Sequence, residues 1–347
     1  MACVSVVIPL YETERYVAEA IRSVLAQTYT DFEVIVVDDG SKDNGPAIAR
    51  SFDDPRIRVV SQTNRGLAGA RNTGIREAHG RYIALLDADD AWHPTKLEKL
   101  VAVLEHDGGA GIVFAASNFI DDDGAPLGLV QKPQRTNYTP ADVFCRNPVG
   151  NGSSPIIRRE TLDAIAFDDD RYDRTCWFDE SFRQSEDIEC WTRIAALTSW
   201  RFAYVDEALT NYRVNSTGLS ANTGRQLETW RRFRAKVRSY APDLEARHGN
   251  LAEAYQLRYL ARRAVRGQSG AAALRMSLQA VALSPRILLE EPARTVTTVA
   301  AAALQAVLPA RLFATIEALA IGRSARPSVG IASNAAPVPA PGSAVRT

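Results

Sequence analysis

The stretch RYIALLDADDAW, residues 81–92, passes without a break from apolar residues into acidic ones. Its first part, up to Leu86, is an unbroken apolar run of the length expected for a buried strand. Three carboxylates, Asp87, Asp89 and Asp90, follow at once. Ionised carboxylates this close repel one another, so the turn needs a counter-charge. A buried strand that ends in clustered carboxylates predicts a functional edge of a sheet.

Strand and helix patterns alternate around this stretch, through the first 115 residues or so. Short runs rich in β-branched residues predict strands at 4–8, 33–37, 57–60, 81–86 and 111–116. Between them, apolar residues recur with helical spacing from Val17 to Leu25, and the segment 94–107 opens with a proline suited to the first turn of a helix. The alternation predicts an α/β fold, with a mostly parallel sheet flanked by helices.

The rest of the chain is less regular and then becomes helical. Residues 117–128 contain Asp-Gly, which is typical of a turn between strands, and 200–214 has an extended pattern. From about residue 225 the pattern is helical, and the last 25 residues are rich in Ala, Pro, Ser and Val. We therefore expect boundaries at 1–224, divided near 116, a helical region at 225–322 and a disordered tail at 323–347.

Composition limits the class of protein. A length of 347 residues suggests two folding units or one large domain with appendages, and a net charge of zero gives no case for nucleic-acid binding. The N-terminus lacks the features of a signal peptide, and no uncharged apolar run reaches the roughly 18 residues of a membrane span. The cysteines, Cys3, Cys145, Cys176 and Cys190, have no paired spacing. These features predict reduced thiols in a cytoplasmic protein.

Polar residues follow three of the predicted strands. Pro9 to Glu12 follow the first strand, Asp38 to Ser41 the second, and Asp87 to Asp90 the fourth. In a parallel sheet, ligands bind outside the carboxyl ends of the strands, so these segments should meet at one edge. Carboxylate oxygens suit Mg²⁺ or Mn²⁺, which take further ligands from a substrate's phosphates. The alternative is a solvated acidic turn before a helix that begins near Pro94.

Phosphate binding by a glycine loop is excluded, because the chain has neither a P-loop nor G-x-G-x-x-G after a strand. The segment NRGLAGARNTG (64–74) has glycines but leads into a helix and carries Arg65 and Arg71. Arginines can bind a diphosphate with two hydrogen bonds at once. They are equally compatible with ordinary residues at a helix start, and the sequence does not decide between the two.

Five segments, VSVVIPLYE, VIVVDDGSKD, NRGLAGARNTG, YIALLDADD and SEDIECWTR, resemble the family 2 glycosyltransferases in order and spacing. The resemblance spans residues 3–215 and implies a GT-A fold, a divalent metal (Mn²⁺ or Mg²⁺) and inversion at the anomeric carbon. It implies a nucleotide-diphosphate sugar donor, commonly a UDP-sugar, and a hydroxyl acceptor on a glycan or lipid-linked sugar. Bacterial-type polysaccharide or glycolipid assembly is the expected context. Residues 1–116 would then form the nucleotide-binding half, and 117–224 the acceptor half.

The resemblance also implies roles for single residues. The nucleotide pocket would comprise Pro9, Tyr11, Glu12, Asp39, Arg71 and Asp87. Within it Asp39 would accept a hydrogen bond from the base, commonly uracil. Asp87 would meet the ribose or the metal shell, and Asp89 would hold the metal. Asp187 would be the catalytic base, while Glu186 and Trp191 would contact the acceptor.

The position of Asp187 agrees with its implied role. SEDIECWTRIAAL reads as a helix with Asp187 in its first turn, where the helix dipole favours a carboxylate. Adjacent helical residues point about 100° apart, so one of Glu186 and Asp187 can face the donor and the other the acceptor. The alternative is that both only stabilise the start of the helix.

One departure keeps a non-catalytic alternative open. Relatives often carry a histidine after a Tyr-Arg pair where this chain has Asn215. A loss of that histidine would weaken a metal or phosphate contact, as in a module that only binds nucleotide-sugars. Phosphatases of the haloacid-dehalogenase class place Asp-x-Asp after the first strand with a later Thr, whereas Ala91 stands here. Nucleotide-sugar pyrophosphorylases have a glycine-rich basic loop, which PLYETERY (9–16) is not.

The helical region has an uneven charge. Residues 225–266 contain 11 basic and 4 acidic residues, a net charge of +7, and an apolar segment at 295–322 follows. Basic residues attract anionic lipid, and an amphipathic apolar helix lies in the membrane interface, so peripheral contact with the inner face of a membrane is one interpretation. A helical cap on the catalytic domain, with solvated arginines, is the other.

Overall fold

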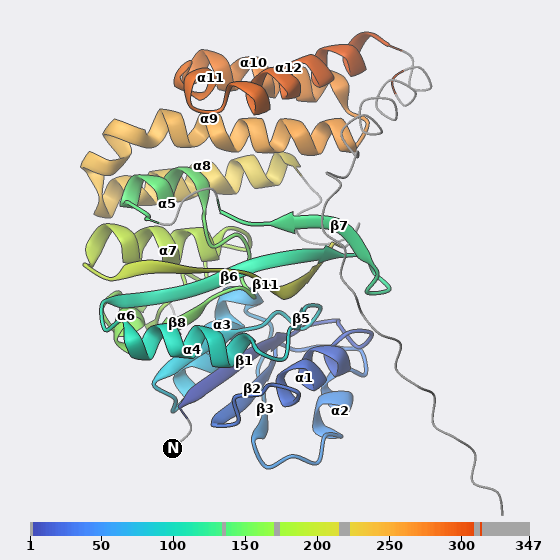
Figure 1. Ribbon diagram of the computed structural model, residues 1–347, viewed down its shortest axis with the longest axis vertical. Helices are drawn as coiled ribbons and strands as arrows, with labels where there is room; N and C mark the ends of the chain where they lie inside the picture. Colours follow the sequence, from blue (N-terminus) through green and yellow to red (C-terminus); the bar gives the residue numbers. More distant parts are fainter. Residues whose placement is uncertain (1–2, 134–136, 170–173, 215–222, 309–312, 314–347) are drawn as a thin grey trace, which may run out of the picture.

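A computed structural model describes residues 3–133, 137–169, 174–214, 223–308 and 313. Within these residues, nine strands form one sheet in the order β3-β2-β1-β4-β8-β6-β11-β5, with β7 paired to β6 (Figure 1). The strands of the sheet are β1 (Val4–Leu10), β2 (Phe32–Asp38), β3 (Ile57–Ser61), β4 (Tyr82–Leu85), β5 (Ala91–Trp92), β6 (Ala110–Ile120), β7 (Pro126–Gln131), β8 (Ile156–Arg158) and β11 (Arg201–Arg213). A separate hairpin joins β9 (Phe167–Asp169) and β10 (Arg174–Cys176).

The predicted parallel arrangement is confirmed for the part of the sheet that carries the acidic turn. Strand β1 pairs in parallel with β2 on one side and with β4 on the other, and β2 pairs in parallel with β3. The second part is mixed: β6 and β11 are parallel, whereas β8, β5 and β7 pair antiparallel with their neighbours. Because β6 runs across position 116, the two predicted halves share one sheet.

Helices cover both faces of the sheet, as the alternation of side chains along its strands requires. Val4, Val6 and Ile8 of β1 belong to the core under α1 (Val17–Leu25) and α4 (Lys96–His106). Val7 belongs to the core under α3 (Gly66–Glu77) and α7 (Glu186–Leu197). A Cβ on Gly74 would overlap Val7 Cγ1, so α3 can lie against β1 only because Gly74 has no side chain. Short helices complete this domain: α2 (Gly45–Arg50), α5 (Pro140–Arg146) and α6 (Arg159–Asp163).

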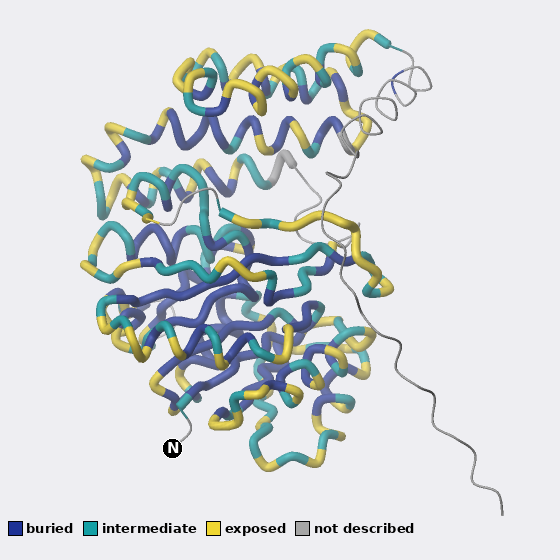
Figure 2. Tube along the Cα trace, in the orientation of Figure 1, coloured by how far each residue is buried: buried dark blue, intermediate teal, exposed yellow. Residues whose placement is uncertain are grey.

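The C-terminal helices form a further layer, which lies on the α5 and α7 side of the molecule (Figure 1). They are α8 (Thr223–Tyr240), α9 (Pro242–Arg266), α10 (Gly270–Leu283), α11 (Arg286–Glu290) and α12 (Pro292–Val307). Trp230 and Phe233 of α8 pack in a buried aromatic cluster with Phe144 of α5 and with Phe182. Figure 2 shows that the middle of α9 is mostly buried, whereas β7 is mostly exposed.

Much of the positive charge of this layer is neutralised within the protein. Arg234 bonds Glu245 and Glu253 at 2.7 and 2.6 Å, and Arg238 bonds Glu245 at 2.9 Å. These pairs favour the helical-cap interpretation, and membrane contact stays a prediction. No helix among the described residues combines the length and apolar character that crossing a bilayer requires. Asn215, the predicted tail at 323–347 and most of 309–322 lie outside the described residues.

Candidate active site

Three strand ends meet at one edge of the sheet, as the sequence predicted. Leu10 at the end of β1 is paired with Asp38 at the end of β2, and the backbone N–H of Asp39 donates to the Leu10 carbonyl at 2.9 Å. On the other side of β1, the Leu86 N–H donates to the Val7 carbonyl at 3.0 Å, just before the acidic turn. Residues separated in sequence by more than 70 positions therefore line one edge.

Asp39 is a buried carboxylate held by three donors. One oxygen accepts from Gln62 Nε2 at 2.7 Å and from the Arg65 N–H at 2.8 Å, and the other accepts from the Gly66 N–H at 2.8 Å. Burial raises the pKa of Asp39 above its usual value, and these hydrogen bonds act against that rise. Because its neighbours fix this carboxylate, its remaining capacity to accept a hydrogen bond has a defined direction.

The segment after β1 lies beside Asp39. Pro9 is buried within β1, and Tyr11 is 49% exposed. Glu12 adopts a left-handed conformation with φ 52°, and its Oε1 accepts from the Lys42 N–H at 3.0 Å. The segments after β1 and β2 are thus tied together next to the exposed Tyr11.

The three carboxylates of the acidic turn differ in burial. Asp90 is buried, and it accepts from Ser153 Oγ at 2.5 Å and from the Arg213 N–H at 2.8 Å. Burial, together with the charges of Asp89 and Asp87, raises the pKa of Asp90 well above its usual value. Asp87 and Asp89 are only partly buried. Asp90 therefore holds the turn from inside, whereas Asp87 and Asp89 keep part of their surface exposed.

These two carboxylates fit a divalent metal that takes most of its ligands from a diphosphate. No cluster of three or more His, Cys, Asp or Glu side chains that could hold a metal is found among the described residues. Mg²⁺ is commonly bound by one or two carboxylates plus substrate phosphates, and Asp89 with Asp87 provides such a donor set. A metal bound here would hold and neutralise the diphosphate.

A buried lysine under the turn was not predicted. Lys96, the first residue of α4, donates from Nζ to the Ser153 carbonyl at 2.6 Å and to Thr210 Oγ1 at 2.7 Å. Its ammonium lies 4.5 Å from the centre of the Trp92 ring, and burial lowers its pKa well below the usual value. In sequence Lys96 looks like an ordinary basic residue in the first turn of a helix, so no local signal identifies it.

The loop at residues 147–155, between α5 and β8, contacts the acidic turn. Ser153 Oγ accepts from the Asp87 N–H at 2.9 Å while it donates to Asp90, so one hydroxyl ties both ends of the acidic turn. Asn151 Nδ2 donates to Ser117 Oγ at 2.8 Å, which anchors the loop to β6. These contacts were not predicted from the sequence.

The first turn of α7 carries the two predicted acceptor-side carboxylates. Ser185, before the helix, adopts φ 63°, and Glu186 follows with 5% of its surface exposed. Burial raises the pKa of Glu186 to about 7 and raises the pKa of Asp187 as well. Asp187 is partly exposed, and its Oδ1 accepts from the Ile188 N–H at 2.8 Å. Glu186 is therefore the buried carboxylate of the two, and Asp187 is the partly exposed one.

Arg71 connects the two sides of the site. Its Nη2 bonds Asp87 Oδ1 at 2.7 Å and its Nη1 bonds Glu186 Oε1 at 2.7 Å. The side chain is 1% exposed, so the arginine lies behind these carboxylates. Arg71 therefore joins the acidic turn after β4 to the first turn of α7, a bridging position that the sequence did not indicate.

Trp191 corrects one sequence prediction. Its side chain has no exposed surface, and its ring packs edge-on against Phe178 at 5.9 Å between centroids, within the core under α7. A side chain enclosed in this way does not offer a surface to an acceptor. Its position five residues after Glu186 puts it on the inward face of α7. From the helical pattern alone, a face that packs in the core cannot be told from a face that binds a ligand.

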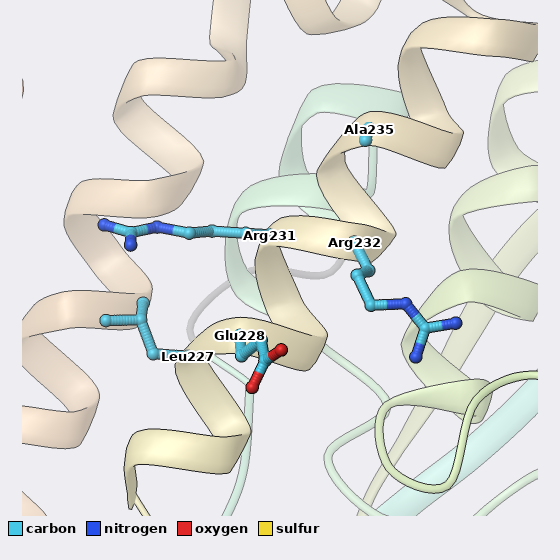
Figure 3. A pocket seen from close by; sticks show the side chains of 5 residues that line it. All are labelled: Leu227, Glu228, Arg231, Arg232 and Ala235. Carbon is cyan, nitrogen blue, oxygen red and sulfur yellow. The ribbon is translucent and has the colours of Figure 1, made fainter.

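A hollow of about 400 Å³ on α8 lies apart from this site (Figure 3). It is lined by Leu227, Glu228, Arg231, Arg232 and Ala235. The two arginines extend in different directions from the helix, and each has a partner: Arg231 bonds Glu253 at 2.9 Å, and the guanidinium of Arg232 lies 5.3 Å from the Phe182 ring. These contacts assign the hollow to the packing of the helical layer.

Comparison with known proteins identifies the family. Residues 5–164 match the model of Glycosyl transferase family 2. The putative teichuronic acid biosynthesis glycosyltransferase TuaG of Bacillus subtilis is 31% identical over 65% of this chain and 85% of its own length. The Escherichia coli protein UDP-Glc:alpha-D-GlcNAc-diphosphoundecaprenol beta-1,3-glucosyltransferase WfgD is 29% identical, over 65% and 82%.

Solved structures share the fold. TarS of S. aureus, in complex with UDP-GlcNAc, gives a TM-score of 0.58 at 20% identity, over 85% of this chain and 89% of that one. The mannosyltransferase PcManGT of Pyrobaculum calidifontis, in complex with GDP-Man and Mn²⁺, gives 0.54 at 24% identity, over 88% and 86%. The mixed sheet, its helical covering and the sequence matches agree. This chain belongs to the family 2 glycosyltransferases and has their GT-A-like fold.

Proposed function

We propose that this glycosyltransferase moves a sugar from a UDP-sugar to an acceptor hydroxyl with inversion, and that a divalent metal at Asp89 and Asp87 assists it. One observation carries the proposal. Asp87, on the proposed sugar-donor side, and Glu186, next to the proposed base Asp187, are both bonded to Arg71 at 2.7 Å. A site built only to bind nucleotide-sugars would not need Glu186 and Asp187.

The donor would lie along the strand ends. Asp39 would accept from the N3–H of uracil, and Tyr11 would stack against the nucleotide. Pro9 and Glu12 would shape the pocket at the end of β1. The diphosphate would reach the Asp87–Asp90 turn, where Asp89 would hold the metal. WfgD is named for UDP-Glc and TarS has been solved in complex with UDP-GlcNAc, which supports this choice of donor.

The acceptor would approach from the first turn of α7. Its hydroxyl oxygen forms a bond to the anomeric carbon as the bond from that carbon to the diphosphate oxygen breaks on the opposite face. Asp187 takes the hydroxyl proton, and the electron pair of the broken bond leaves on the nucleoside diphosphate. A positioned base of this kind contributes typically 10²–10⁴-fold to the rate. Glu186 is buried, so it would contact only the edge of the acceptor.

The names of two relatives support a class of acceptor. WfgD is named for a diphosphoundecaprenol acceptor and TuaG for teichuronic acid, so a lipid-linked or glycan hydroxyl is the proposed acceptor, in polysaccharide or glycolipid assembly. Such an acceptor would bring the enzyme to the cytoplasmic face of a membrane, with α8–α12 as a candidate contact surface.

The test is UDP release from a panel of UDP-glucose, UDP-galactose and UDP-N-acetylglucosamine with Mn²⁺, with and without a polyprenyl-diphosphate-linked sugar. We expect one donor to be turned over, faster with the acceptor, and the product to show the inverted anomer by NMR. Binding of UDP and these UDP-sugars without turnover would instead identify a non-catalytic binding module. Equal affinity for UDP and ADP would remove the role proposed for Asp39.

A further inference from the structure

Arg71 occupies a position that is costly for a charge. The guanidinium is buried, and its Nε has no hydrogen-bond partner among the described residues. Removing an ion from water is unfavourable unless its partners have good geometry, and here two carboxylates on different elements supply it. The planar fork of an arginine can bond both at once, whereas the single ammonium of a lysine cannot hold two divergent partners in the same way.

The fold also leaves room for this arginine at one chosen place. Gly152 lies in the loop before Ser153, and a Cβ there would overlap Arg71 Nη2 and lie 3.1 Å from Asp87 Oδ2. Gly152 has no strained φ that would require a glycine on backbone grounds. Its lack of a side chain is therefore explained by the guanidinium and the carboxylate that it contacts.

We propose that Arg71 is a positioning residue of the transfer reaction: it joins Asp87 on the donor side to Glu186 at the start of α7, in a space that Gly152 keeps open. Through Glu186 it sets the first turn of α7, and hence the neighbouring Asp187, relative to the donor. This inference rests on the proposed function and differs from a nucleotide contact, the role that the sequence resemblance implied for Arg71.

The two roles predict opposite kinetic effects. A residue that binds the nucleotide contributes to affinity, so its loss weakens UDP binding and leaves kcat at saturating donor nearly intact. A residue that sets the distance between base and donor contributes at the transition state, where a misplacement of about 1 Å costs on the order of 100-fold in rate.

The experiment compares Arg71→Lys with Arg193→Lys. Arg193 is a matched control, because it is also buried, bonds Glu189 on the same helix and donates to the Trp177 carbonyl at 2.5 Å, yet it has no partner in the proposed site. UDP affinity is measured by calorimetry with Mn²⁺, and kcat from UDP release at saturating donor. We expect R71K to lower kcat about 100-fold with UDP affinity close to wild type, and R193K to keep kcat.

A second pair of variants tests the same contact without removing the arginine. Gly152→Ala should displace the guanidinium and lower kcat in the same direction as R71K. Gly109→Ala is its control, since a Cβ at Gly109 would overlap the guanidinium of Arg201 at an exposed pair with Asp107, away from the site. We expect G109A to keep kcat. If R71K does not fold, G152A and G109A decide the question.

Three results would overturn the inference. The first is a loss of UDP affinity in R71K with kcat preserved, which would make Arg71 a nucleotide ligand. The second is wild-type kcat in both R71K and G152A. The third is an equal fall of kcat in R193K, which would reflect general destabilisation. Failure of the proposed function is recognised separately, because the wild-type enzyme itself would then release no UDP from any UDP-sugar of the panel, and the inference would fall with it.

Discussion

Carboxylates are placed under opposite conditions in two regions of this protein. At the strand-end site, burial raises the pKa of Asp39 and Asp187 and raises that of Glu186 to about 7. Where the helical layer meets the catalytic domain, burial also acts to raise the pKa of Asp179, but Lys236 lowers it to about 2. Hydrogen bonds from Arg238 lower the pKa of Glu245 within the layer.

The difference separates the carboxylates of the proposed site from those that stabilise the fold. A carboxylate whose pKa is lowered by a partner contributes to stability, whereas one whose pKa is raised by burial reduces it. Clusters of the second kind gather at functional sites, because a general base works best with a pKa near the working pH. Four measurements can break or sharpen this comparison.

The largest expected effect is on turnover by Asp187→Asn. Without a group to take the hydroxyl proton, kcat should fall 10²–10⁴-fold, while UDP affinity with Mn²⁺ stays near wild type. Glu189→Gln is the control on the same helix, because Glu189 is buried and bonded to Arg193 and is expected to affect stability only. Retention of more than about a tenth of wild-type turnover in D187N would move the base elsewhere, with Glu186 first to test.

Asp89→Asn should remove the Mn²⁺ dependence of UDP binding without unfolding the protein. An amide is a weaker ligand than a carboxylate for a hard cation, and Asp89 is the proposed metal ligand. Calorimetry with and without Mn²⁺ measures the difference. Asp123→Asn, at an exposed pair with Arg15, provides a control acid on the neighbouring hairpin. Unchanged Mn²⁺ dependence in D89N would discard the metal assignment.

Phe233→Ala should test the structural side of the comparison. Phe233 is fully buried against Phe144 and Trp230, and emptying such a position costs about 3–5 kcal/mol of unfolding free energy. Leu289→Ala, at a position that is 85% exposed, should change stability by less than about 0.5 kcal/mol. Denaturant unfolding measures both. Equal stabilities would show that the helical layer is not a structural cap.

The smallest effect concerns pH. The pKa of Glu186 in the folded protein, about 7, exceeds its usual value of 4.5, so stability falls as pH rises through this interval, because the unfolded chain loses the proton first. Glu186→Gln removes this ionisation, so the melting temperature of the variant should fall less between about pH 5 and pH 8 than that of the wild type, whatever the cost of weakening the pair with Arg71. Glu245 has a lowered pKa, so its contribution is present at pH 8 and is lost in acid, and Glu245→Gln should lower the melting temperature. An equal fall of the melting temperature from about pH 5 to pH 8 in the wild type and in E186Q would contradict the raised pKa of Glu186.

The fold and the donor edge could be predicted from the sequence because they depend on short-range patterns. Runs of β-branched residues marked β1 to β4 to within a few residues, and strict alternation with helices implied their parallel pairing. Once that pairing is given, geometry alone places Asp39 and the Asp87–Asp90 turn at one edge. The antiparallel pairing of β8 between β4 and β6 was not predicted, since three residues carry no readable period.

The tertiary structure alone decided how the charges of the site are used. Arg71 and Glu186 are 115 positions apart, and Ser153 and Asp90 are 63 apart, so no periodicity relates one to the other. Asp87, Asp89 and Asp90 are equivalent as sequence, yet Ser153 holds Asp90 in the interior, while Asp87 and Asp89 remain only partly buried. The same packing buries Trp191 and places Lys96 beneath the turn. Burial and hydrogen-bond direction depend on how distant segments close over a residue, and they determine which carboxylates become structural and which remain for chemistry.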